Sequence, residues 1–483
     1  MSKGIATLCL CGALASACSG DPEPEAGGQN QAATSGGEVG MAREMPTGVV
    51  VPSDAPGADA TPAPEPQVAA APAASRMGPP PLVESAQSAL RPPPAGTPSP
   101  WGATDAESGR ALPARKPMAK NAKRSFDNGV VAARKFQNEA AAVAFAAALA
   151  ADPKAYEAAY NLAVVADREG KTNIALQHYH KALDLQPDYE RAVEGIVRIH
   201  LRNGSASAAL AEAEPIARTW ERNLYLQAIL AEVLVAVGRL DDAEKAARRA
   251  LQRDERFVPA MVALAKASLA RGRGELAASI LEQASAIDAN DPEIQFLQGL
   301  AFRQQGRLLD ALNAFRKAVE LRPEYAEARM ALGVQYLAAG NYAEALAQLE
   351  VTVHLVPTLV AAHLNLGDAY RAQKEWKKAK AEFDNALRMQ DPLPEAHFNL
   401  GLMYMSAGGN FPQMDTLAAL ERATLEFSTY REQMGSRLPR DDASAGYIAD
   451  LQRQIEREKK RIEREQRRQA QERDRAKDGG TGK

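Results

Sequence analysis

Histidine is the side chain best suited to acid–base catalysis or metal binding near neutral pH, and this chain contains six of them. His178 and His180 stand two residues apart in a segment with helical periodicity, so they do not share a helix face. His363 and His397 stand 34 residues apart, which is the period of a repeat in this chain and predicts neighbouring helices. Such a pair could hold a metal ion, but we favour a packing or solvated role for both rings.

The short motifs that usually mark catalytic or cofactor sites are missing from the sequence. It has no Gly-x-Gly-x-x-Gly fingerprint, no phosphate-binding loop, no nucleophile elbow and no His-Glu-x-x-His pair. We therefore predict that the chain is not an enzyme. We also predict no cofactor, no metal site and no small-molecule substrate.

The three cysteines, Cys9, Cys11 and Cys18, all lie at the start of the chain. An apolar run at residues 4–17 follows Lys3 and is too short to span a bilayer as a helix. This arrangement is typical of a secretory signal. A chain that loses the signal keeps at most Cys18, so we predict neither a disulfide framework nor a cysteine-based zinc site.

The residues around Cys18 resemble a bacterial lipoprotein signal, because Leu-Ala-Ser-Ala at 14–17 precedes the cysteine and Ser19 follows it. The resemblance implies that residues 1–17 are removed and that Cys18 is acylated to become a lipid anchor. Ser19 then favours the outer membrane, with the protein facing the periplasm. The alternatives are anchoring in the inner membrane and a plain secretory signal that is cleaved after Ala15 or Ala17.

Residues 18–120 form a long segment rich in proline, alanine and glycine. Nineteen of the chain's 30 prolines lie between Pro22 and Pro117, and no apolar periodicity survives among them. Such a segment cannot bury enough apolar surface to offset the entropy lost on ordering. We predict a disordered tether with a span of roughly 50–60 Å if it behaves as a flexible coil. The alternative is that the proline runs at 79–81 or 92–94 are docking ligands for a partner.

A 34-residue period governs the chain that follows. Glycine recurs at this step from Gly170 to Gly340, and alanine recurs at the same step from Ala175 to Ala379. Apolar residues at helical spacing flank each glycine. Each period therefore predicts two antiparallel helices joined by a glycine in the left-handed conformation. One hairpin cannot bury its apolar face alone, so the hairpins must stack on one another.

The repeat resembles the tetratricopeptide repeat, a family built from helical hairpins of this length. In the unit 292–325 the matching residues are Gly299, Phe302, Gly306, Ala311, Phe315, Ala318 and Pro323. About nine units begin at residues 122, 156, 190, 224, 258, 292, 326, 360 and 394, and together they cover 121–430. The resemblance implies an all-α fold, a right-handed superhelix or α-solenoid, which binds segments of other proteins along its concave face.

Some positions depart from the regular repeat. Ala213 and Ala247 replace the aromatic residue of the second helix in two units. Pro215 lies inside a predicted second helix and should kink or end it. Lys374 replaces the turn glycine of the unit 360–393, which costs about 1 kcal/mol if that residue must be left-handed.

The resemblance also suggests which residues face a ligand, because the family uses fixed places of the first helix. Asn161, Asn365 and Asn399 match the asparagine that contacts the ligand backbone in peptide-binding relatives. An apolar stripe occupies neighbouring places in the later units: Phe296, Leu300, Met330, Val334, Leu337, Leu364, Phe398, Leu402 and Met405. These apolar residues either line an exposed groove for a partner or fill the core between helices, and the sequence leaves both open.

The segment 431–477 is strongly charged, and residues 478–483 are predicted to be disordered. Tyr447, Ile448, Leu451 and Ile455 form a short apolar stripe, which predicts a helix whose first turns cap the last repeat. Residues 453–477 include 11 basic and 6 acidic side chains. We favour a solvated capping helix. The alternatives are a partner-binding coiled coil and a contact with an anionic surface.

The net charge of the whole chain is only −3, which argues against a nucleic-acid binder driven by bulk charge. The predicted anchor, tether and repeats together favour a non-catalytic, membrane-anchored scaffold that binds other proteins of a cell-envelope complex. The same combination resembles the repeat lipoproteins of the myxobacterial gliding-motility apparatus. The alternative is a regulatory or substrate-binding subunit of an envelope enzyme, or of pilus or outer-membrane assembly.

Overall fold

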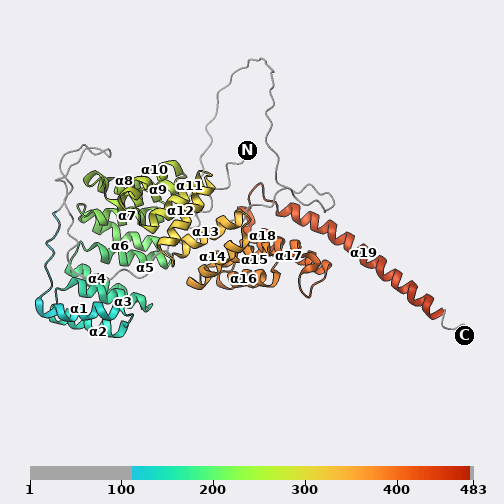
Figure 1. Cartoon of the computed structure of the whole chain (residues 1–483), viewed down its shortest axis with the longest axis horizontal. Coiled ribbons are helices and arrows are strands. Elements are labelled where there is room, and N and C mark those ends of the chain that lie inside the picture. The colour runs from blue at the N-terminus through green and yellow to red at the C-terminus, as the bar shows by residue number, and fades with distance from the viewer. Residues whose placement is uncertain (1–110, 479–483) are drawn as a thin grey trace, which may run out of the picture.

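The computed structural model describes residues 111–478. Within that range the regular structure is entirely helical, with nineteen α-helices in tandem (Figure 1). The predicted all-α solenoid is confirmed. Cys18, the signal and the tether up to residue 110 lie outside the described residues, so the predictions made for them stay predictions.

Eighteen of the helices pair into nine hairpins. The first helices are α1 (Lys120–Arg134), α3 (Tyr156–Arg168), α5 (Glu190–Arg202), α7 (Leu224–Ala236), α9 (Val258–Ala270), α11 (Pro292–Gln304), α13 (Ala326–Ala338), α15 (Val360–Ala372) and α17 (Pro394–Ala407). The second helices are α2 (Asn138–Ala151), α4 (Thr172–Leu185), α6 (Ala206–Thr219), α8 (Leu240–Arg253), α10 (Gly274–Ile287), α12 (Leu308–Leu321), α14 (Tyr342–Leu355), α16 (Trp376–Met389) and α18 (Thr416–Met434). Two 3-10 turns, η2 (Gly408–Asn410) and η3 (Gly435–Arg437), flank α18, and α19 (Ser444–Asp478) follows.

The turn inside each hairpin requires a left-handed residue. Six glycines spaced by 34 residues, from Gly170 to Gly340, have φ between 71° and 80°. This conformation lets the chain reverse while its backbone groups bond back to the first helix, as Lys171 N–H does to Ala166 O at 2.9 Å. Lys374 has φ of 62° at the same place in its unit, and Phe136 has φ of 56° in the first hairpin. Lys374 is therefore left-handed, which is the condition under which the sequence assigned it a cost.

The substitution Lys374→Gly should raise the free energy of unfolding by up to about 1 kcal/mol, because glycine adopts this φ without a Cβ clash. The side chain of Lys374 is exposed, so its removal costs little packing. Urea unfolding followed by circular dichroism measures the change. Lys377→Gly, at an exposed position inside α16, is the matched control and should lower stability instead. A loss of stability from Lys374→Gly would contradict the assignment of strain.

Each later hairpin closes by packing a large side chain of its second helix on a glycine of its first helix. A Cβ atom added at Gly367 would lie 2.5 Å from Cε1 of Phe383, and one added at Gly401 would lie 2.8 Å from Cε1 of Phe427. Both rings are fully buried. The glycines are therefore present because the two helices approach too closely for any side chain between them.

In the two units without this aromatic residue, a buried alanine takes its place in the second helix. Ala213 and Ala247 are fully buried within one continuous core that also holds Trp220 and Leu230. Pro215 lies inside α6, which continues to Thr219, so the expected ending of the helix does not occur. Pro215 and Ala211 are both exposed, so the carbonyl group that loses its helical hydrogen bond faces water.

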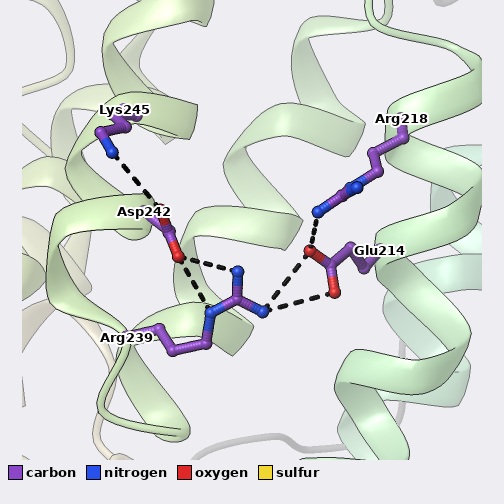
Figure 2. Close-up of polar contacts among 5 residues, drawn as sticks. All are labelled: Glu214, Arg218, Arg239, Asp242 and Lys245. Carbon is purple, nitrogen blue, oxygen red and sulfur yellow. Dashed lines mark hydrogen bonds and ion pairs between the residues drawn. The ribbon is translucent and has the colours of Figure 1, made fainter.

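An ion network ties the second helices α6 and α8 together on the outside of the array (Figure 2). Arg239, just before α8, reaches Glu214 of α6 at 3.4 Å and Asp242 of α8 at 2.7 Å, and Arg218 also contacts Glu214. The hydrogen bond from Arg239 lowers the pKa of Asp242. Because Arg239 is exposed and Glu214 and Asp242 are only half-buried, the network adds little to stability.

The first helices form the inner side of the array and the second helices the outer side. Successive first helices touch directly, as α7 does with α5 and α9. Every side chain of α3 between Tyr156 and Asp167 is buried, whereas α4 buries only Ala175, Tyr179 and Ala182. A partner that binds on the inner side of the array would therefore contact side chains of the first helices.

The last helix, α19, packs on the array only through its first turns. Leu451 and Ile455 are buried in the core that α17 and α18 form, and Lys459 Nζ lies 3.3 Å from Glu421 in α18. The remainder of α19 projects away from the array (Figure 1). Between residues 111 and 478, no helix combines the length and the apolar character needed to cross a membrane.

Candidate protein-binding face

Lys266 in α9 lies between two carboxylates that come from the neighbouring first helices. Its Nζ contacts Glu232 of α7 and lies 2.7 Å from Oε1 of Glu293 in α11. Burial of the ammonium group acts to lower the pKa of Lys266, but the two carboxylates outweigh it and raise that pKa. We call Glu232, Lys266 and Glu293 the charged ladder. It joins three consecutive repeats through their inner faces.

The charged ladder extends to a fourth first helix through Glu194 of α5. Burial raises the pKa of Glu194, Arg198 on the same helix opposes this, and the ladder residues Glu232 and Glu293 reinforce the rise. Glu194 therefore lies within electrostatic reach of Glu232 and Glu293, as well as of Arg191 and Arg198 on its own helix. A further cation that approaches such a carboxyl group stabilises its charged form.

Polar side chains bridge successive first helices at two other places. Asp167 of α3 accepts a hydrogen bond from Arg202 of α5 at 2.5 Å. Asn399 of α17 donates to Asp368 of α15 at 3.0 Å. Burial raises the pKa of Asp368, against the opposing charge of Arg371. The inner face thus carries paired polar groups at several places, and of these residues the sequence singled out only Asn399.

The irregular segment 111–119, which precedes α1, crosses the edge of the array near α5. Arg115 contacts the carboxylate of Glu190, and its guanidinium carbon lies 5.8 Å from the ring centre of Tyr189. Leu112 packs against the core of the following units. The predicted disorder of 18–120 is therefore wrong for 111–119. The proline-rich composition of the segment concealed an ion pair and an apolar contact that hold it.

The three candidate asparagines are placed differently from one another. Asn161 and Asn365 are buried, and Asn365 donates to Ala361 O of its own helix at 2.9 Å. Asn399 is only half-buried and pairs with Asp368. Direct contact with a ligand backbone stays a prediction for all three, and it is simplest for Asn399.

The apolar stripe lies in the core and not on an exposed surface. Seven of its nine members are buried: Phe296, Leu300, Met330, Val334, Leu337, Leu364 and Leu402. Phe296 packs against Phe315 at 5.8 Å between ring centres, and the half-buried Phe398 packs against Phe427 at 5.5 Å. Met405 is half-buried against the core of the last units. The groove alternative is therefore wrong for the buried residues, because each first helix is covered by its own hairpin and by both neighbours.

His363 and His397 each pair with a glutamate of their own hairpin. His363 Nδ1 lies 2.6 Å from Glu382 and its Nε2 lies 2.9 Å from Pro357 O, while His397 Nδ1 lies 2.7 Å from Glu426. Within the described chain, no group of three or more histidine, cysteine or acidic side chains is arranged to hold a metal ion. Both rings fasten hairpins, as the packing alternative predicted.

The His363 pair should make stability depend on pH. Both ring nitrogens face acceptors, so the ring must carry two protons, and the hydrogen bond to Glu382 raises its pKa despite burial. Because the pKa is raised in the folded state, the protonated ring stabilises the fold fully at pH values below the unfolded pKa of about 6.5. That contribution is lost as the pH rises through the folded pKa. We expect a loss of about 1 kcal/mol there by urea unfolding.

The variant His363→Gln should remove this pH dependence, whereas His354→Gln, at an exposed position on α14, should leave it in place. An unchanged profile in His363→Gln would show that another group titrates.

Comparisons with known proteins agree with the helical hairpins. Two family models described as tetratricopeptide repeat match residues 296–359 with 364–412, and 234–300. A curated relative, the cytochrome c-type biogenesis protein CycH of Rhizobium meliloti (strain 1021), is 36% identical over 98 residues, which are 20% of this chain and 26% of that protein. The chain thus spans about a quarter of the length of that relative.

Three solved structures illustrate the similarity in the course of the chain. The Cut9–Hcn1 complex of the APC/C is 13% identical with a TM-score of 0.48, over 69% of this chain and 76% of that one. Pseudomonas aeruginosa pilF is 18% identical with a TM-score of 0.40, over 48% and 98%. MamA is 24% identical with a TM-score of 0.30, over 33% and 94%. On the family models and the 34-residue hairpins, the repeat array of this chain belongs to the tetratricopeptide repeat family.

Proposed function

We propose that this protein is a non-catalytic scaffold that is anchored to a membrane through Cys18 and binds a segment of a partner protein along the inner face of its repeats. The observation that carries the proposal is the convergence of charged side chains from α5, α7, α9 and α11 on one face. Tetratricopeptide repeats commonly act in protein–protein interaction, and this face is where such an array offers specific polar groups.

The chemistry of the face favours a partner segment with basic residues. Glu232 and Glu293 both contact Lys266, and burial raises the pKa of Glu194 on the neighbouring first helix although Arg198 and Arg191 oppose the rise. A lysine or arginine from a partner would stabilise the charged form of Glu194, whose burial disfavours that form. The segment 111–119 provides an internal example, since Arg115 docks on Glu190 at the edge of the same array.

Capture of partners from detergent-solubilised envelope tests this part of the proposal. The wild-type chain should recover a defined set of envelope proteins, and Glu194→Lys should lose most of them because it places a cation against incoming basic groups. Glu320→Lys, on the exposed outer side of α12, is the matched control and should recover the full set. Equal recovery by all three forms would exclude the inner face as the binding surface.

The anchor is a separate part of the proposal and needs its own test. Metabolic labelling with a palmitate analogue should mark the wild-type chain and should not mark Cys18→Ala. Membrane fractionation should then place the wild type in the outer membrane and release the variant. Labelling that persists in Cys18→Ala would contradict the lipoprotein assignment.

Within the cell envelope, we propose gliding motility as the process. Loss of surface movement in a strain that carries Cys18→Ala would support this proposal.

A second candidate is a subunit of an envelope assembly pathway. The observation that favours it is the sequence match to a protein named for c-type cytochrome biogenesis. A deletion strain would separate the two: loss of covalently bound haem with normal movement favours assembly, and loss of movement with normal haem content favours the motility scaffold.

A further inference from the structure

The distal part of α19 is a charged helix without a partner in the described chain. Beyond Lys459, which pairs with Glu421 of α18, the side chains described are exposed, apart from a half-buried Ile462. Pairs such as Arg467 with Glu463 and Arg468 with Glu472 lie at i,i+4 spacing and support the helix in isolation. The helix therefore projects into solvent as a preformed arm (Figure 1).

The arginines of this arm are segregated to one side. At 3.6 residues per turn, five exposed arginines fall within an arc of about 60° and extend over about 27 Å of helix. These are Arg457, Arg461, Arg464, Arg468 and Arg475, and we call them the arginine stripe. No acidic residue falls within that arc. Lys460 and Arg467 extend the basic surface on one side of the stripe. On its other side lie Glu465 and Glu472, which pair with Arg461 and Arg468.

The charge of the arm is opposite to that of the remaining chain. Residues 453–477 carry a net charge of +5 while the whole chain carries −3, so the remaining residues carry −8. Residues 1–110 carry −6 of that charge and residues 111–452 carry only −2, so the arm itself is what electrostatics favours for contact with an anionic surface.

We propose that the arginine stripe docks on the anionic phospholipid surface of a membrane. A flat surface can meet the helix along the arginine stripe alone. The major groove of a nucleic acid would instead enclose the helix and bring its walls against the acidic flanks, including Glu458 and Glu465. The arm has no apolar face, since Ile462 and Ala470 are its only apolar residues from 459 to 475, so the contact is electrostatic and does not insert into the bilayer.

Sedimentation with vesicles tests the proposal on the full chain carrying Cys18→Ser, which removes the lipid anchor as a cause of binding. The protein should bind vesicles of equal parts phosphatidylglycerol and phosphatidylcholine and should not bind phosphatidylcholine alone. Binding should disappear in about 1 M salt, where the screening length falls to roughly 3 Å. Because the anchor is absent, failure here leaves the Cys18 assignment intact.

Paired variants show whether the stripe itself is responsible. Arg457→Gln with Arg464→Gln should weaken partition by about tenfold or more, since each basic residue near such a surface contributes roughly fivefold. Lys459→Gln with Arg473→Gln removes the same charge from the opposite side of the helix and should weaken it far less. Circular dichroism checks that both pairs keep the helix. Equal losses from the two pairs, binding to neutral vesicles, or tighter binding to duplex DNA would overturn the proposal.

Discussion

The substitution Gly367→Val is expected to lower the free energy of unfolding by about 3 kcal/mol. The added side chain would meet the buried ring of Phe383, whose Cε1 lies 2.5 Å from the Cβ position. Neither helix can withdraw freely, because α15 is held by its own second helix and by both neighbouring units. Urea unfolding measured by circular dichroism gives the size of the loss, and hydrogen exchange shows whether it spreads beyond the hairpin.

Two further variants separate overpacking from other effects of the Gly367 change. Phe383→Ala alone should cost about 3–5 kcal/mol through the cavity that it leaves. In the double variant the valine has room, so the combined cost should be smaller than the sum of the two single costs. Gly446→Val is the matched control, since no atom lies within 4 Å of its added Cβ. Additive losses in the double variant would show that the ring and the glycine act independently.

Replacing the central cation of the charged ladder, as in Lys266→Met, is expected to cost about 3 kcal/mol. The change leaves Glu232 and Glu293 without the ammonium group of Lys266 that both carboxylates contact. The loss should be smaller at low pH, where the two carboxyl groups become protonated and no longer repel each other. Urea unfolding at several pH values measures both effects.

The stability lost in Lys266→Met should be recoverable by further substitutions in the charged ladder. Adding Glu232→Gln and Glu293→Gln to Lys266→Met should restore most of the lost stability, because the uncompensated charges are removed. Lys245→Met, on the outer helix α8 and paired with Asp242 in solvent, should change stability by less than about 0.5 kcal/mol. A small effect of Lys266→Met that equals the control would show that the ladder is fully solvated.

The regular part of the fold could be predicted from the sequence because it depends on local rules. Gly170 and its successors mark turns that only a left-handed residue allows, and the fixed 34-residue step reports the stacking of identical units. The same step located Lys374 at a turn position, and its φ of 62° places it in the left-handed region like the glycines. The effect of Pro215 on its helix was harder to predict. Whether a proline ends a helix depends on whether the carbonyl group that loses its hydrogen bond faces water, and the packing of the array decides that.

The binding face was predicted less well, because helical spacing shows which residues share a face but not what covers that face. Phe296 and Leu300 fit the ligand-facing places of the family, yet the neighbouring units bury them. The charged ladder was missed although Glu232 and Lys266 stand one repeat apart, a spacing that places opposite charges on adjacent first helices. Contacts such as Arg115 with Glu190 join residues far apart in the chain and leave no periodic signal.

Site-directed photocrosslinking in the native host tests the central claim most directly. A photoreactive phenylalanine at Arg191 or Tyr225 samples the first helices, and one at Arg249 or Lys317 samples the exposed outer helices. We predict that the two inner positions crosslink the same envelope protein and that the two outer positions do not. Crosslinks only from the outer positions, or none from any position in intact cells, would contradict an inner-face scaffold.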